Sequence, residues 1–373
     1  MKILIITSEM PPVKSGFARL VTRHKVGLER LGHEVDVISR QDMWLREYNE
    51  VRLTPLSFRQ TLSPQRLQQY DIVHVHGPAP TISDYVLFGF RLIPMRNRPK
   101  LIYSHHCNID LPQFGILNSL YKGITGQLAR LADHVITATP AYADMIAKHM
   151  SRDRISVIPY GIDEAFYIDI PKRDDFTVLF VGQMRPYKGV DVLLKSAEML
   201  RDVRFEIVGR GYNLDMYKTM AHERQLDNVT FHGMVADEGL KALYGGSHVL
   251  TLPSLTTAEA FGIVQIEGMA SGCVPVSSQL PGVADVANLA GISVTPGSAS
   301  ALRSGFAHFA EQREEWEYRS KLARHIARTF NWPQVVQAHE RLYEHVLYQP
   351  GLIKSQFGRI YNLRPNWSPA YAA

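Results

Sequence analysis

The chain has 373 residues, of which 45% are hydrophobic and 21% charged, and its formal net charge is +5 at pH 7. These fractions exclude an intrinsically disordered chain, and the length exceeds what one hydrophobic core usually serves, so we expect two domains. The apolar opening, residues 3–6, is too short for a signal peptide, and no window is long and apolar enough to predict a transmembrane segment.

Positive charge is concentrated in the first half of the chain. Residues 1–173 hold 22 Lys and Arg against 16 Asp and Glu, whereas the remainder holds 19 against 20. The basic residues form two clusters: Arg19, Arg23 and Lys25, and Arg91, Arg96, Arg98 and Lys100. Such clusters are attracted to an anionic membrane surface or a phosphate-bearing acceptor, or are simply solvated. No nucleic-acid partner is expected, because no aromatic-rich basic strands or helix-turn-helix pattern accompany them.

Cysteine and histidine spacing gives no sign of a metal site. Cys107 and Cys273 lie far apart and fit no ligand spacing, so a reduced, cytoplasmic location is the simplest inference. His74 and His76 alternate along a predicted strand, but no carboxylate or third histidine lies at a suitable spacing. We therefore predict packing and rim positions for these two histidines, and no metal or cofactor.

Short β-branched runs alternate with helical patterns along the chain, which predicts an α/β protein with parallel sheets covered by helices. In the first half the predicted strands are residues 3–7, 34–39, 72–76, 101–104, 134–139 and 155–158. One predicted helix runs from about Gly16 to Leu31, with Gly32 as its stop, and another covers roughly residues 117–132.

The pattern restarts after a turn-rich connector at about residues 160–175. The second series of predicted strands is 177–181, 204–208, 229–232, 248–252, 273–277 and 292–295. We place an amino-terminal domain at 1–165, a carboxyl-terminal domain at 166–348 and a tail at 349–373. The last helix begins near Pro333, and whether it crosses back to the first domain stays open. The crevice between two such domains is the expected active site.

Two segments of the second half carry the chemistry. The loop from Gly182 to Gly189 follows a predicted strand and opens a helix, where backbone N–H groups and the helix dipole favour a phosphate; Arg185 and Lys188 add positive charge. Farther on, Glu259 and Glu267 stand eight positions apart. Either glutamate alone is usually a solvated helix residue. Together, with apolar neighbours around the second, they predict carboxylates in a ligand cleft, with a sugar hydroxyl as a suitable partner.

Residues 176–285 resemble the donor half of retaining glycosyltransferases of family four, which have the GT-B fold of two Rossmann-like domains. The resemblance lies in the Arg and Lys before a helix and in the Glu-x7-Glu segment with Phe-Gly after its first glutamate. It implies that Arg185 and Lys188 neutralise the leaving nucleoside diphosphate, that Glu259 contacts the donor sugar and that Glu267 binds the ribose. Gln183 departs from the family pattern, which often has arginine there.

The resemblance also implies roles for neighbouring loops. Backbone N–H groups of four residues would complete the diphosphate site: Phe261, Gly262, Ile263 and Val264. Two further loops would surround the nucleoside: Gly209 with Gly211, and Met234 with Val235. Without the resemblance, such glycines would be read as ordinary chain reversals.

The first domain contributes two more motifs by the same resemblance. The segment from Pro11 to Gly16 is similar to the family's Gly-Gly loop, with Ser15 in place of one glycine, so Gly16 is the predicted donor contact. Aligning on His-Cys gives His106 the sugar-binding role, with Asn108 where the family has an acid. His105 remains the alternative to His106. The non-functional interpretation is a capped or solvated histidine.

The function implied is transfer of a hexose from a UDP- or GDP-sugar to a lipid-linked or oligosaccharide acceptor, with an α-linkage, in polysaccharide, lipopolysaccharide or glycolipid biosynthesis. The resemblance implies a front-side displacement without a nucleophilic side chain and without a metal. Two alternatives stay open, a nucleotide-sugar epimerase of related fold and a non-catalytic carbohydrate-binding or scaffold protein. We expect a cytoplasmic enzyme that contacts the inner face of an anionic membrane through its basic first domain.

Overall fold

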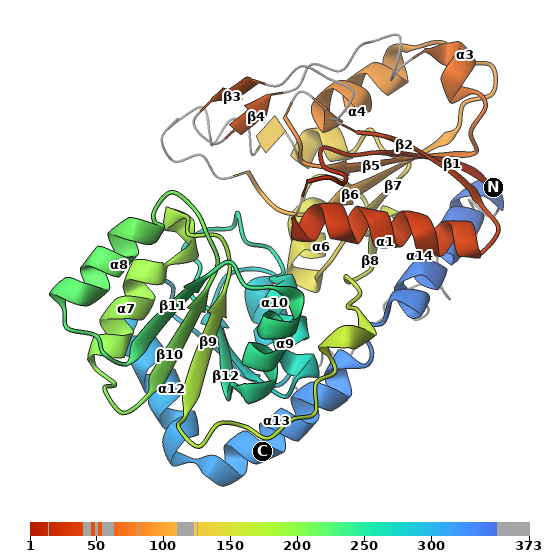
Figure 1. Ribbon diagram of the computed structural model, residues 1–373. Coiled ribbons are helices and arrows are strands. Elements are labelled where there is room, and N and C mark those ends of the chain that lie inside the picture. Colours follow the sequence, from red (N-terminus) through yellow and green to blue (C-terminus); the bar gives the residue numbers. More distant parts are fainter. Residues whose placement is uncertain are drawn as a thin grey trace. The chain divides into compact units, whose positions relative to one another are not determined.

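The computed structural model describes residues 1–13, 15–39, 46–48, 51–53, 63–80, 82–109, 123–124 and 126–348. Lys14, the tail 349–373, and residues 117–122 and 125 of the helix predicted at 117–132 lie outside these residues; of that helix, residues 123–124 and 126–129 are helical. The chain forms two compact units, whose described parts are residues 1–161 with 332–348, and residues 162–331. Each unit contains one six-stranded parallel sheet (Figure 1).

In the first unit the sheet has the order β2-β1-β5-β6-β7-β8, with all neighbours parallel. The strands are β1 Lys2–Ile6, β2 Glu34–Ile38, β5 Ile72–Gly77, β6 Lys100–His105, β7 His134–Thr137 and β8 Ile155–Val157. The helices that follow strands are α1 Gly16–Arg30, α3 Pro64–Leu67, α4 Ser83–Leu92 and α6 Pro140–Ala147. An antiparallel pair, β3 Arg46–Tyr48 and β4 Val51–Leu53, was not expected from the sequence.

The last helix, α14 (Trp332–Tyr348), belongs to the first unit. It packs against α1, where Gly27 leaves room for Val336; a Cβ at Gly27 would lie 2.4 Å from Val336 Cγ2. The ring of His33 also bonds to Glu340 over 2.9 Å. The chain thus returns to the first unit after Asn331, where the sequence analysis assigned residues 166–348 to the second domain and left this crossing open.

The second unit repeats the architecture with the strand order β11-β10-β9-β12-β13-β14. Its strands are β9 Thr177–Val181, β10 Arg204–Val208, β11 Val229–Gly233, β12 Val249–Leu252, β13 Val274–Ser278 and β14 Ile292–Val294. Its α-helices are α7 Val190–Glu198, α8 Leu214–Glu223, α9 Asp237–Gly246, α10 Ile263–Ala270, α11 Val283–Ala287, α12 Ala299–Glu311 and α13 Arg313–Ala327. All twelve predicted strands are confirmed to within two residues.

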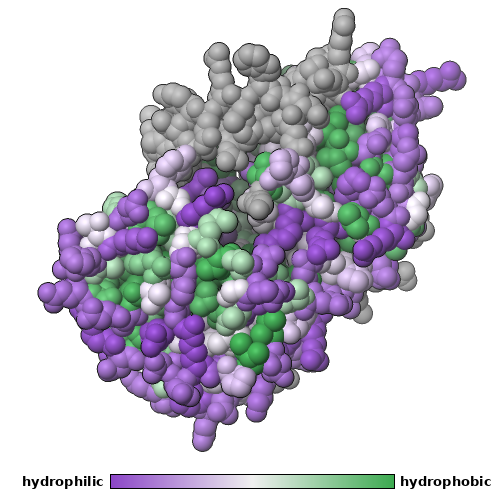
Figure 2. All heavy atoms as spheres, viewed as in Figure 1, coloured by the Kyte–Doolittle hydropathy of each residue, from purple (hydrophilic) through white to green (hydrophobic). Residues whose placement is uncertain are grey.

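Each unit has a hydrophobic core of its own, because a parallel sheet covered by helices is buried on both faces. Hydrophilic residues cover most of the visible face of the second unit, with hydrophobic ones in smaller groups between them (Figure 2). Among the described residues, no helix combines the length and the apolar character that crossing a bilayer requires.

Candidate functional site

In the second unit, the loops that follow four neighbouring strands meet at one edge of the sheet. Strands β11, β10, β9 and β12 are adjacent and parallel, so their carboxyl ends share that edge. Backbone hydrogen bonds tie the loops together: Met184 N–H donates to Arg210 over 2.9 Å, and Leu255 N–H donates to Tyr187 over 2.7 Å. The fold therefore collects the candidate residues of this unit where open α/β sheets bind ligands.

Lys188 and Glu259 lie in direct contact at this edge. The Lys188 ammonium group donates a hydrogen bond to Glu259 Oε2, and each side chain is only 13% exposed. Lys188 ends a short 3-10 turn, Pro186–Lys188, whereas Glu259 lies between β12 and α10. Two motifs that the sequence analysis treated separately thus form one charged pair.

The electrostatics of Lys188 keep it protonated. Burial is the largest effect and lowers its pKa, but the attraction of Glu259 and Tyr187 outweighs burial, so the pKa is raised. Arg185 lies near enough to oppose this rise. Two cations therefore stand together with one carboxylate close to the start of α10, an arrangement that would attract an anionic ligand.

The amino end of α10 begins at Gly262, which has a φ of +68° and provides no side-chain cap. A Cβ on Gly262 would lie 2.3 Å from Leu252 Cδ2, so this position needs glycine both for its backbone and for its close packing. The first N–H groups of a helix lack intrahelical partners, which makes those of Ile263 and Val264 suitable for a phosphate. Phe261 is buried, with its ring edge-on to Phe330, and anchors the loop in the core.

Glu267 is only 3% exposed, and its Oε2 accepts a hydrogen bond of 2.8 Å from the Tyr244 hydroxyl group. Tyr244 lies on α9 and is fully buried. A buried carboxylate is costly unless hydrogen-bonded, and this phenol stabilises it. The sequence analysis missed Tyr244, because nothing in the spacing of α9 marks one tyrosine as the partner of a glutamate 23 positions later.

The loop after β10 approaches its neighbour very closely. Gly209 has a φ of +141°, and a Cβ there would lie 1.7 Å from the carbonyl oxygen of Gly182. The approach at Gly211 is less close but still tight, since its Cβ would lie 2.8 Å from the carbonyl oxygen of Met184. After β11, Met234 is 59% exposed and Val235 is half-buried. These four residues lie on the same sheet edge as the charged pair.

The first unit holds the other two candidate positions, Gly16 and His106. Ser15 is the N-cap of α1: its hydroxyl oxygen accepts from Ala18 N–H over 3.0 Å and its O–H donates to Glu9. The serine that replaces a family glycine therefore stabilises a helix start. Gly16 is the first residue of that helix. Glu9 was not singled out from the sequence.

His106 follows β6 and has both ring nitrogens engaged. Its Nδ1 lies 2.7 Å from the Tyr160 hydroxyl group, and its Nε2 lies 2.8 Å from Nδ1 of His76. Burial lowers the pKa of His106 to about 3 and that of the alternative candidate, His105, to about 4, so both rings are neutral near pH 7. His105 contacts Asn108 over 3.3 Å. Sequence spacing gave no sign of Tyr160, which lies 54 residues after His106.

Comparison with known families identifies the chain. Residues 14–166 match the model described as Glycosyltransferase Family 4, and residues 163–327 match Glycosyl transferases group 1. The chain belongs to the family 4 glycosyltransferases. This glycosyltransferase is 29% identical to the D-rhamnosyltransferase WbpZ of Pseudomonas aeruginosa over 66% of each chain. It is 26% identical to O-antigen chain mannosyltransferase C of Escherichia coli, over 69% of this chain and 74% of that one.

Solved structures show the same fold. The glycosyltransferase superposes on HepE of Anabaena in complex with UDP with a TM-score of 0.72 at 19% identity, covering 92% of this chain and 99% of that one. With the two parallel six-stranded sheets, this similarity confirms the predicted GT-B fold.

Proposed function

We propose that this glycosyltransferase moves a hexose from a UDP- or GDP-linked donor to a hydroxyl group of a lipid-linked or saccharide acceptor, with retention of configuration and an α-linkage. The observation that carries the proposal is the contact between Lys188 and Glu259, beside Arg185 and the uncapped start of α10. The names of the relatives, a rhamnosyltransferase and a mannosyltransferase, support a role in polysaccharide, lipopolysaccharide or glycolipid biosynthesis. The UDP bound to HepE supports a nucleoside diphosphate as leaving group.

The charged pair suits departure of a diphosphate. As the bond between the sugar C1 and the phosphate oxygen breaks, negative charge grows on the diphosphate, and Lys188, Arg185 and the N–H groups of Ile263 and Val264 stabilise it. The acceptor oxygen attacks C1 from the face that the diphosphate leaves, and its proton passes to the departing phosphate. No side chain acts as a nucleophile, and fixed positive charge takes the place that a hard metal ion would otherwise fill.

The carboxylates recognise the two ends of the donor. Glu259 exchanges its contact with Lys188 for hydroxyl groups of the sugar, which releases the ammonium group to the phosphate. Glu267 accepts hydrogen bonds from the ribose hydroxyls with Oε1, while Tyr244 holds Oε2. In the first unit, Gly16 allows the backbone to approach the donor, and His106 hydrogen-bonds the sugar after exchanging one of its present partners.

A donor panel tests the proposal. The purified full chain is mixed with UDP-, GDP- and ADP-sugars, with and without a membrane lipid extract, and both diphosphate release and donor isomerisation are followed. Acceptor-dependent release from a UDP- or GDP-sugar, unaffected by added Mg²⁺ or Mn²⁺, is expected. Conversion of the donor without release would favour the epimerase alternative. Absence of both reactions would favour the non-catalytic one.

A further inference from the structure

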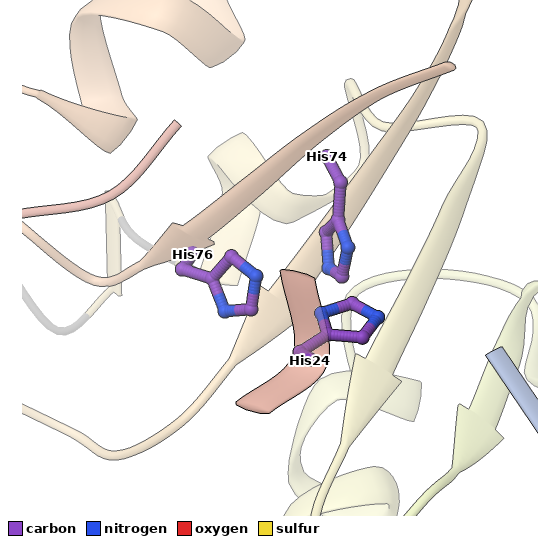
Figure 3. Close-up of side chains that lie close together, drawn as sticks. All are labelled: His24, His74 and His76. Atoms are coloured by element: carbon purple, nitrogen blue, oxygen red, sulfur yellow. The ribbon is translucent and has the colours of Figure 1, made fainter. Parts of the chain in front are cut away.

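Three buried histidines of the first unit lie close together: His24 on α1, and His74 and His76 on β5 (Figure 3). One ring nitrogen from each lies within 4.8 Å of the others, and none of the three residues is more than 2% exposed. The sequence alone predicted no metal site, because spacing along the chain shows only His74 and His76 on the strand. The fold supplies the third histidine from a different element.

Two ring nitrogens of these histidines have no hydrogen-bond partner within the part of the chain that the structure describes. They are Nδ1 of His24 and Nε2 of His76. A buried polar atom without a hydrogen-bond partner destabilises the fold. Both histidines line the same cavity of about 20 Å³, which is room for one water-sized particle. An occupant of this cavity that binds to nitrogen would satisfy both atoms.

The remaining contacts allow both nitrogens to present lone pairs. His24 Nε2–H donates to the Tyr343 oxygen over 3.4 Å, and the Tyr343 hydroxyl donates to His74 Nδ1 over 2.6 Å. His74 Nε2–H then donates to Ser104 over 2.7 Å. In this set of tautomers His24 Nδ1 carries no proton.

The same holds for His76. If its proton is on Nδ1, it donates to His106 Nε2 over 2.8 Å, and His106 Nδ1–H donates to Tyr160 over 2.7 Å. His76 Nε2 then presents a lone pair. Burial lowers the pKa of His24, His74 and His76 well below the ordinary value, which keeps them in the neutral form that binds metals.

We propose that this cavity binds one transition-metal ion of the Zn²⁺ class through His24 Nδ1 and His76 Nε2. His74 is the exchangeable third ligand. Its ring is stacked on His76 at 4.3 Å and both its nitrogens are engaged, so it reaches the ion only by giving up its bond to Ser104. Water completes the coordination. Imidazole ligands favour zinc, copper or nickel over Mg²⁺ and Ca²⁺, which need oxygens, and no carboxylate stands among the described residues that line the cavity.

The ion would set the protonation of a residue in the proposed donor site. A metal on His76 Nε2 fixes that ring's proton on Nδ1, where it is donated to His106. His106 then carries its own proton on Nδ1, facing Tyr160. Metal binding itself does not depend on glycosyl transfer, so failure of one claim leaves the other standing.

Zinc binding by the full chain, with any histidine tag removed and the protein stripped by a chelator, tests the site. Titration against a competing chelator should show one Zn²⁺ per chain, and Mg²⁺ should give no binding. His24→Ala and His76→Ala should each weaken zinc binding about tenfold or more. Ser104→Ala, which frees His74, should strengthen it. The control His308→Ala, at a histidine whose side chain is 44% exposed in the second unit, should bind like the wild type.

Two further readouts separate binding from folding. Zinc should raise the melting temperature of the wild type but not of His76→Gln, and Co²⁺ should give a tetrahedral visible absorption band that the same variant lacks. A wild-type chain that takes up no zinc holds only a water there and contradicts the proposal. Unchanged zinc affinity in a folded His24→Ala, His76→Ala double variant also contradicts it.

Discussion

Lys188 and Glu259 are 71 positions apart, yet the ammonium group of one donates directly to the carboxylate of the other. Both side chains are largely buried, so each charge depends on its partner while no donor is bound. A nucleotide sugar offers replacements for both, hydroxyl groups for Glu259 and phosphate oxygens for Lys188. In the proposed function, the ion pair would therefore mark the position where sugar and diphosphate join, which is the bond that the reaction would break.

Lys188→Ala should lower turnover by about 100-fold or more, because it removes a prearranged cation from the leaving group. Its effect on acceptor KM should be small. The matched control is Lys195→Ala: Lys195 is 48% exposed and lies 3.7 Å from Asp191, outside the site. The turnover of both variants is measured as steady-state diphosphate release. Equal turnover would show that Lys188 does not belong to the site.

Glu267→Ala should weaken binding of the free nucleoside diphosphate, measured by calorimetry, about tenfold, since a good hydrogen bond to a charged group contributes about 1.5–3 kcal/mol. Tyr244→Phe keeps the carboxylate but loses the phenol that holds it over 2.8 Å, so a smaller weakening is expected. A Tyr244→Phe effect larger than that of Glu267→Ala would show that the phenol itself, rather than the carboxylate, binds the nucleotide.

Gly209→Ala should reduce both stability and activity, because the new Cβ would meet the Gly182 carbonyl oxygen at 1.7 Å at a φ of +141°. Gly233→Ala is the control: its φ is +64°, but a Cβ there meets nothing within 4 Å. The control should lose about 1–2 kcal/mol of unfolding free energy through left-handed backbone strain, and Gly209→Ala should lose clearly more. Denaturant unfolding measures the loss of unfolding free energy in each variant. Equal losses in the two variants would argue against the close approach at Gly209.

Acid should destabilise both units. Burial lowers the pKa of His134 in the first unit and of His248 in the second to about 3, below the value of about 6.5 for an unfolded histidine. The unfolded chain therefore takes up protons first, so stability is retained above pH 6.5 and lost as pH falls from there toward 3. Each histidine should contribute a loss of about 2 kcal/mol at pH 5. His248→Asn should flatten the pH dependence of the unfolding free energy of the second unit.

The protein should attach to an anionic membrane through the first unit. Around α4, Phe88 and Leu92 are 57% and 66% exposed. Arg91 and Arg98 already have partners within the unit: Arg91 pairs with Asp133, and Arg98 donates hydrogen bonds to backbone carbonyl groups. Apolar contact should therefore contribute alongside charge. Co-sedimentation with anionic liposomes at low salt should drop in a Phe88→Ser, Leu92→Ser variant, and a wild type that stays in the supernatant would contradict attachment.

The sequence predicted the strands well because buried parallel strands are short apolar runs between turn residues, as in Val249–Leu252. The β3–β4 pair was missed, since three-residue strands such as Arg46–Tyr48 carry no alternating pattern. The return of α14 was left open, because the pattern of an amphipathic helix does not show which sheet the helix covers. Contacts such as that of Val336 with Gly27 assign it to the first unit.

The charged residues of the site were predictable from local motifs, whereas their partners were not. Glu259 and Lys188 each stand in a recognisable segment, but Tyr244, Tyr160 and His24 act through contacts between elements far apart in sequence. Such partners depend on which side chains the fold brings together.

The anomeric configuration of the product tests the central claim most directly. The full chain is incubated with the α-linked nucleotide sugar that it turns over and with the acceptor, and the new linkage is assigned by NMR from the coupling at C1. Front-side attack beside the Lys188–Glu259 pair predicts an α-linked product. A β-linked product would contradict it, because attack would then come from the face opposite the diphosphate.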